Sequence, residues 1–172
     1  MNENRFWQLI DEAWSASSDL QRFQTAVHAT IGSRKERDAF LETQPVGETC
    51  IPGNELFIDS LRNALELLSQ EDLLKFDRLM ERKLFEIDRQ DIHEFTDGSD
   101  DGFLYCRGFI VALGRKFYEA VNANPSNAFF DFECYEITYL SQELYEEKFG
   151  SMPPSDICRE SFSNTGAWSD MD

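Results

Sequence analysis

The chain has 172 residues and a net charge of −17, which suits a single domain and sets a negative potential around the whole molecule. This charge disfavours binding to nucleic acid phosphates and to anionic membranes, and it favours cationic partners. No apolar run approaches the roughly 20 residues of a membrane span, and no signal segment opens the chain, so we expect a cytoplasmic protein. The cysteines stand singly with no metal-type spacing and are expected to be free thiols: Cys50, Cys106, Cys134 and Cys158.

Two helices are predicted at the start of the chain. Apolar residues recur at three- and four-residue spacing from Phe6 to Trp14, which is the pattern of one buried helix face. Trp7 lies off this stripe and is expected to be packed by another helix. Ser18 begins a second helix with the spacing of a capping box, and Gly32 ends it.

Three more helices follow before the middle of the chain. Ser33 caps a short charged helix, after which proline and glycine residues break regular structure over residues 44–53. A fourth helix begins near Asn54. Ser69 then caps a long fifth helix whose apolar face extends to Ile87.

The strongest helix signal lies at residues 100–121. Ser99 is a good N-cap, and Asp100 and Asp101 fall in the first turn, where their charge complements the positive helix end. Apolar residues then continue on more than one face, which predicts a central helix packed on several sides. Two glycines interrupt this stretch and suggest close approach by a neighbouring helix or a ligand: Gly108 and Gly114.

The last part of the chain predicts one long helix and a tail. Residues 122–127 form a turn, and apolar residues from Phe129 to Phe149 predict the helix. We therefore expect a single helical domain over residues 1–150 and an acidic tail over residues 151–172. Two aromatic residues of the tail are expected to anchor it to the domain: Phe162 and Trp168.

Four segments together resemble one bacterial family. The run SDDGFLYCRGFIVALGR at residues 99–115 is similar to the hallmark of the domain-of-unknown-function family 4240. RFWQLIDEA, LSQEDLLKFDRLMERKLFEID and ECYEITYLSQELYEEKFG resemble the same family in the same order. Residues 32–53 have the appearance of an insertion. The resemblance implies an all-helical domain and supplies no established activity.

These observations predict an all-α fold. We expect a compact bundle of about six or seven helices around a central buried helix near residues 100–121.

Charged residues of the central stretch form one candidate site: Asp100, Asp101, Arg107 and Arg115. On one continuous helix, Asp100 and both arginines would share roughly one side. The cluster could be a small pocket for an anionic or zwitterionic ligand, with paired carboxylates for acid–base chemistry. The favoured interpretation is a structural network of ion pairs and hydrogen bonds that fixes helix register, because buried charges must be paired.

The sequence does not predict a metal or a cofactor. Acids and hydroxyls from Asp97 to Asp101 follow the first half of a calcium loop, but Gly108 stands where the bidentate glutamate is needed. No phosphate loop, zinc motif or nucleophile motif is present, so no catalytic residue is assigned and an enzymatic role is disfavoured.

Charge is the basis for the functional hypothesis. From Phe129 onward there are ten acidic residues against only Lys148 and Arg159. We expect an acidic protein–protein interaction module, most concretely an immunity-type inhibitor that neutralises a basic toxin or a nucleic-acid-acting enzyme. A small-ligand site on the central polar cluster, and an acidic surface that only aids solubility, are the alternatives. The expected partner-binding residues are five glutamates: Glu133, Glu136, Glu143, Glu146 and Glu147.

Overall fold

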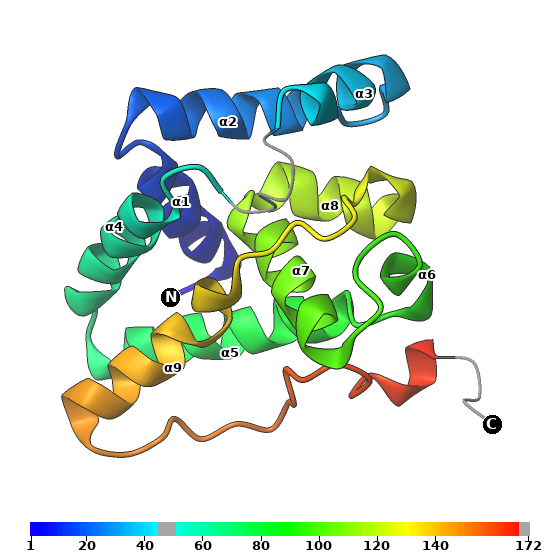
Figure 1. Ribbon diagram of the computed structural model, residues 1–172. Helices are drawn as coiled ribbons and strands as arrows, with labels where there is room; N and C mark the ends of the chain where they lie inside the picture. Colours follow the sequence, from blue (N-terminus) through cyan, green and yellow to red (C-terminus); the bar gives the residue numbers. More distant parts are fainter. Residues whose placement is uncertain (45–50, 169–172) are drawn as a thin grey trace.

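The computed structural model describes residues 1–44 and 51–168 of the chain. Within these ranges it is all-helical, with nine α-helices, two short 3-10 turns and no strand (Figure 1). The α-helices are α1 (Glu3–Trp14), α2 (Ser18–Ala29), α3 (Arg34–Glu42), α4 (Asn54–Glu66), α5 (Gln70–Glu86), α6 (Gln90–His93), α7 (Asp100–Ala112), α8 (Arg115–Ala123) and α9 (Tyr135–Phe149). The 3-10 turns are η1 (Pro125–Asn127) and η2 (Thr165–Ala167). The predicted all-α class is confirmed, and the predicted count of six or seven helices is too low.

Two findings concern the membrane and the cysteines. No helix in the described ranges has the length and apolar character to cross a membrane. Cys106 and Cys134 are buried, and Cys158 is exposed. Cys50 and the predicted loop residues 45–50 lie outside the described residues.

Side chains cap five helix starts, three of them through the serine that the sequence indicates. The caps of α1, α2, α3, α5 and α7 are Asn2, Ser17, Ser33, Ser69 and Ser99. Ser17 rather than Ser18 caps α2, because Ser17 has extended backbone angles and its Oγ accepts a hydrogen bond from the Leu20 N–H at 3.1 Å.

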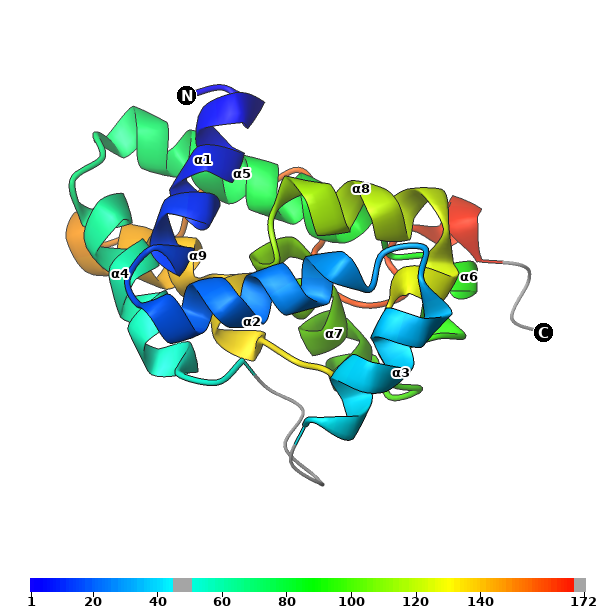
Figure 2. The same ribbon diagram turned by 90° about the horizontal axis from the view of Figure 1, so that it is seen from above.

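α7 is the central element of the bundle. It packs against α5, α8 and α9, and every residue from Gly102 to Ala112 except Tyr105 is buried. In Figure 1, α2 and α3 lie at the top of the molecule and α5 lies at the bottom, and Figure 2 shows α2 passing over α7. This central position explains why apolar residues occupy all sides of α7.

The predicted helix over residues 100–121 is two helices, because the chain turns at Gly114. Gly114 has φ +85°, and a Cβ there would lie 2.3 Å from Asp11 Oδ1. Side chains of α1 and α2 bind the carbonyls exposed at the end of α7. Trp14 Nε1 donates to Ala112 O at 2.7 Å, and His28 Nε2 lies 2.9 Å from Leu113 O. The break is therefore stabilised by residues distant in sequence.

The last helix begins at Tyr135, six residues later than predicted. Asp131 has φ +61°, so the backbone before the helix is not helical. The Cys134 N–H donates to Tyr105 O at 3.1 Å, which holds this connection against α7. A Cβ on Gly108 would lie only 2.4 Å from Cys134 O, so glycine permits the close approach by a neighbouring segment that the sequence suggested.

Residues 151–168 form a C-terminal strap that crosses the bundle (Figure 1, orange to red). Phe162 and Trp168 of the strap pack against each other with ring centroids 4.6 Å apart. As predicted, this aromatic pair anchors the strap to the domain. Trp168 also contacts His93 of α6 at 5.3 Å and Phe103 of α7 at 5.8 Å. The predicted tail is thus packed onto the domain over its described residues. Residues 169–172 lie outside them.

Candidate functional site

The loop before α7 is built around the carboxylate of Asp97. Ser99 Oγ donates to Asp97 Oδ2 at 2.6 Å and accepts from the Gly102 N–H at 3.1 Å. The hydrogen bond from Ser99 lowers the pKa of Asp97. A Cβ on Gly102 would lie 1.6 Å from Asp97 Oδ2, so only glycine leaves room for this carboxylate. The local sequence therefore fixes a charged Asp97 at the start of α7.

The connection between α8 and α9 brings two more carboxylates to Asp97. Carboxylate oxygens of Asp97, Asp131 and Glu133 all lie within 4.8 Å of one another. Burial raises the pKa of Glu133, and the charges of Asp131 and Asp97 raise it further. Among the ion pairs of the described residues, none involves these three carboxylates. The result is a site of concentrated negative charge with no lysine or arginine paired to it.

Exposed aromatic residues flank these carboxylates in the chain. Phe130 is 67% exposed and Tyr135 is 57% exposed, although most aromatic side chains of the protein are buried. The Tyr135 ring packs edge-on against Tyr105 of α7, with centroids 5.7 Å apart. We name Asp97, Asp131, Glu133, Phe130 and Tyr135 the motif surface. It is both acidic and aromatic.

The carboxylates of the motif surface are possible ligands for a cation. Three carboxylate oxygens at this spacing could hold one divalent ion, yet acidic groups on protein surfaces commonly cluster without one. The nearby Cys106 is buried, which raises the pKa of its thiol to about 12. A thiol with this pKa is uncharged at neutral pH and is a poor nucleophile. Cys106 is therefore not favoured as a covalent nucleophile.

Glu133 provides a test of this charge crowding. The folded-state pKa of Glu133 is raised above its ordinary 4.5, so the ionised carboxylate is destabilising. We expect Glu133→Gln to stabilise the protein by less than about 1 kcal/mol at neutral pH, since the side chain is partly exposed. The gain should disappear as the pH falls below 4.5, where Glu133 is protonated in both states. Urea unfolding at neutral and acidic pH measures it, and an equal gain at both pH values would contradict the interpretation.

Arg107 is sealed inside the protein. Its side chain is fully buried, Nη1 donates to Leu84 O at 2.8 Å and Nη2 donates to Ser161 Oγ at 3.0 Å. The guanidinium lies over the Phe103 ring at 4.7 Å, and burial lowers the pKa of Arg107 to about 10. Arg107 therefore joins α7 to α5 and the C-terminal strap and has no access to a ligand from solvent. Asp100 and Asp101, by contrast, are exposed in the first turn of α7.

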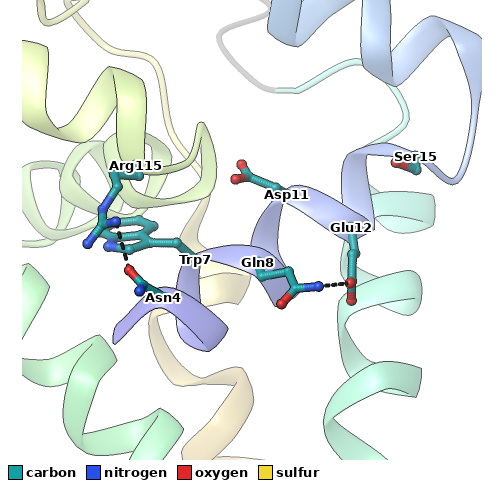
Figure 3. Close-up of a pocket in the computed structure, with 7 residues that line it drawn as sticks. All are labelled: Asn4, Trp7, Gln8, Asp11, Glu12, Ser15 and Arg115. Atoms are coloured by element: carbon teal, nitrogen blue, oxygen red, sulfur yellow. Dashed lines mark hydrogen bonds between the residues drawn. The ribbon is translucent and has the colours of Figure 1, made fainter. Parts of the chain in front are cut away.

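Arg115 lies elsewhere, because the turn at Gly114 places it on α8. It is paired with Glu3 at 3.3 Å and with Glu119 at 3.3 Å, and Nη1 donates to Asn4 Oδ1 at 3.0 Å. Figure 3 shows Arg115 above Trp7 at one end of an open groove of about 480 Å³ between α1 and α8. The structure therefore separates Arg115 from Asp100, Asp101 and Arg107, and the four residues share no cavity.

The same groove contains an unforeseen carboxylate. Asp11 lines it, and burial raises the pKa of Asp11, while the nearby His28 partly opposes the rise. Burial also lowers the pKa of His28. No local sequence pattern singles out Asp11, because its surroundings come from α2 and from the turn at Gly114.

The five glutamates proposed from charge fall into different environments. Glu133 belongs to the motif surface, and Glu136 lines a small hollow beside α4. Glu143 and Glu146 are exposed on α9, and no ion pair of the described residues involves them. Glu147 is already paired with Arg62 of α4. Only Glu133 therefore lies beside the other carboxylates of the motif surface.

Comparison with known proteins gives a family but no activity. A family model described as "Protein of unknown function (DUF4240)" matches residues 49–147. Neither the curated proteins nor the solved structures contain a significant match to the chain. The matched residues include α4 to α8, all of α9 except its last two residues and the whole motif surface, and they end before the C-terminal strap. Because the match covers more than half of the 172 residues, the chain belongs to the DUF4240 family.

Proposed function

We propose that the protein is an acidic protein–protein interaction module and that a basic partner docks on the motif surface. The observation that carries the proposal is the motif surface itself, where three neighbouring carboxylates have no cationic partner among the described residues and two exposed aromatic residues flank them in the chain. A net charge of −17 extends the same negative field over the molecule and speeds the approach of a cationic protein.

An arginine side chain of the partner suits this surface. Its planar guanidinium can pair with carboxylates through several N–H groups and can stack on an aromatic ring. Asp131 and Glu133 supply the carboxylates, and Phe130 or Tyr135 supplies the ring. Tyrosine and arginine are also enriched among the residues that dominate binding energy at protein interfaces.

The most concrete form of the proposal is an immunity-type inhibitor. An enzyme that acts on nucleic acids has a basic cleft, and an acidic protein that covers the cleft presents charge of the same sign as the substrate. The motif surface would enter the cleft, and the exposed acids of α9, Glu143 and Glu146, would lie at the rim.

The alternative of a small-ligand site on the central polar cluster has less support. Arg107 is sealed between helices, and Arg115 is on another helix with two glutamate partners. Asp100 and Asp101 are exposed without an arginine of that set beside them.

The experiment is a comparison of two charge variants with equal net charge. The tagged protein is expressed in the organism that encodes it, copurifying proteins are identified at low and moderate salt, and the recovered partner is purified. We expect D131N/E133Q to weaken binding of this partner by about tenfold or more, because it removes paired charges at the centre of the interface. E143Q/E146Q, which removes the same charge from α9, should change affinity much less and act mainly on the association rate. Recovery of no basic partner, or equal weakening by both variants, would count against the motif surface as the docking site.

A further inference from the structure

A second charged site lies beneath the C-terminal strap. Arg159 is only 4% exposed, and its Nη2 lies 3.0 Å from Asp77 Oδ1 and 2.9 Å from Glu81 Oε1 of α5. Nη1 donates to Thr138 O at 2.5 Å, and the guanidinium lies over the Tyr139 ring at 5.5 Å. Two carboxylates, one carbonyl and one aromatic ring thus surround a single guanidinium, and we name these four residues of α5 and α9 the arginine pocket.

The pocket walls require a cation. Asp77 is fully buried and Glu81 is 4% exposed, and two carboxylates in such surroundings are strongly destabilising unless a positive charge pairs with them. Burial alone would lower the pKa of Arg159, but Asp77 and Glu81 raise it overall. Ser141 Oγ donates to Asp77 Oδ1 at 2.8 Å, while Asp77 Oδ2 is buried with no hydrogen-bond partner. Asp77 Oδ2 thus retains unused capacity to accept a hydrogen bond.

The walls and the occupant belong to different parts of the chain. All four pocket residues lie within the family match at residues 49–147, whereas Arg159 lies outside it. The strap is joined to α9 through Gly150 and two consecutive prolines, Pro153 and Pro154. The guanidinium that fills the pocket thus comes from beyond the matched residues.

The strap is also linked to the start of α7. Asp88, fully buried at the end of α5, accepts the N–H groups of Phe162 at 3.0 Å and Asn164 at 2.8 Å. Ser161 Oγ donates to Asp100 O at 2.6 Å while it accepts from Arg107. Release of the strap would therefore leave Arg107 without the Ser161 hydroxyl as a hydrogen-bond acceptor.

We propose that the arginine pocket is a binding site for an arginine of a basic partner segment, and that Arg159 occupies it as an internal ligand until the strap is displaced. This proposal rests on the proposed function in one respect only, namely that the partner is basic. It adds a second docking site, on the face formed by α5 and α9, whose accessibility the chain itself controls.

The first test asks whether the empty pocket accepts a guanidinium from solution. R159A removes the occupant, and N-ethylguanidinium at millimolar concentration is added as the probe, with ethylammonium as the matched cation. We expect ethylguanidinium to raise the Tm of R159A, to leave wild type unchanged, and to have no effect on R159A/E81Q, which lacks one wall charge. If R159A does not fold by itself, recovery of helical circular dichroism on addition of ethylguanidinium is the readout. Absence of rescue, or equal rescue by ethylammonium, overturns the proposal.

The second test asks whether the strap can be displaced in the wild-type chain. The probe is a capped peptide with the sequence of residues 155–168 in which serine replaces Cys158, asparagine replaces Asp156 and glutamine replaces Glu160, so that Arg159 gives it a positive net charge. The readout is hydrogen exchange of the Phe162 and Asn164 amides. Because the tethered strap has an effective concentration on the order of millimolar, we expect faster exchange of both amides only at millimolar peptide. The same peptide with alanine in place of Arg159 should have no effect. Unchanged exchange with the arginine peptide overturns the proposal even if the first test succeeds.

Neither readout involves the motif surface. Failure of D131N/E133Q to weaken partner binding would therefore leave both results intact, and failure of these two tests would leave the proposed function to be judged separately.

Discussion

Arg159→Ala is expected to lower the free energy of unfolding by about 3–5 kcal/mol, the cost of removing one partner from a buried ion pair. The substitution leaves Asp77 and Glu81 buried without a countercharge and frees Thr138 O from its hydrogen bond with the guanidinium. It also removes the anchor that precedes Phe162 in the strap. Urea unfolding monitored by circular dichroism measures the loss.

Arg78→Ala is the matched control for this prediction. Arg78 lies on the same helix as Asp77, and its ion pair with Asp156 of the strap, at 4.0 Å, is largely exposed. Its loss should cost no more than about 1 kcal/mol. Equal effects of the two alanine variants would mean that the strap is held by surface charge in general and that the buried pocket is not special.

Gly108→Ala is expected to destabilise the protein by about 1–3 kcal/mol, although alanine normally favours a helix. The added Cβ would lie 2.4 Å from Cys134 O and 2.7 Å from Thr138 Cγ2. The first of these atoms is backbone, so α7 and the start of α9 must move apart. For a chain of this size the Tm should fall by about 2–4 °C for each kcal/mol lost.

Gly98→Ala is the control, because no atom lies within 4 Å of the position of its Cβ and its φ is not in the left-handed region. We expect a change of no more than about 0.5 kcal/mol. A Gly108→Ala protein as stable as wild type would show that the approach of α9 to α7 is looser than the structure indicates. In Gly108→Ala, the movement of the start of α9 away from α7 should also disturb the motif surface, because Glu133 is adjacent to Cys134.

The local sequence pattern was sufficient to predict most of the helices. The apolar stripe of α1 is buried from Phe6 to Trp14, and Ser33, Ser69 and Ser99 cap the helices that the sequence assigns to them. These features depend on residues within a few positions of one another, where helical spacing and capping are determined. The family resemblance was also carried by local segments and is confirmed over residues 49–147.

The departures arise where distant residues compete with local preference. Residues 100–121 have the pattern of one helix, yet Trp14 and His28 bind the carbonyls that become free when the chain turns at Gly114. Because of this turn, Arg115 lies on α8 and does not share one side of a continuous helix with Asp100. α9 begins late because its preceding residues are held against α7 by the Cys134 N–H.

The sequence by itself determined the all-helical class, the helix starts with serine caps, the acidic character and the central position of the segment after Ser99. Only the tertiary structure decided which charges meet. Asp97 joins Asp131 and Glu133, Arg107 becomes buried, and Arg159 enters a pocket between α5 and α9. The physical reason is that helix periodicity and capping are properties of a few neighbouring residues, whereas charge pairing depends on the three-dimensional path of loops that join residues far apart in the chain.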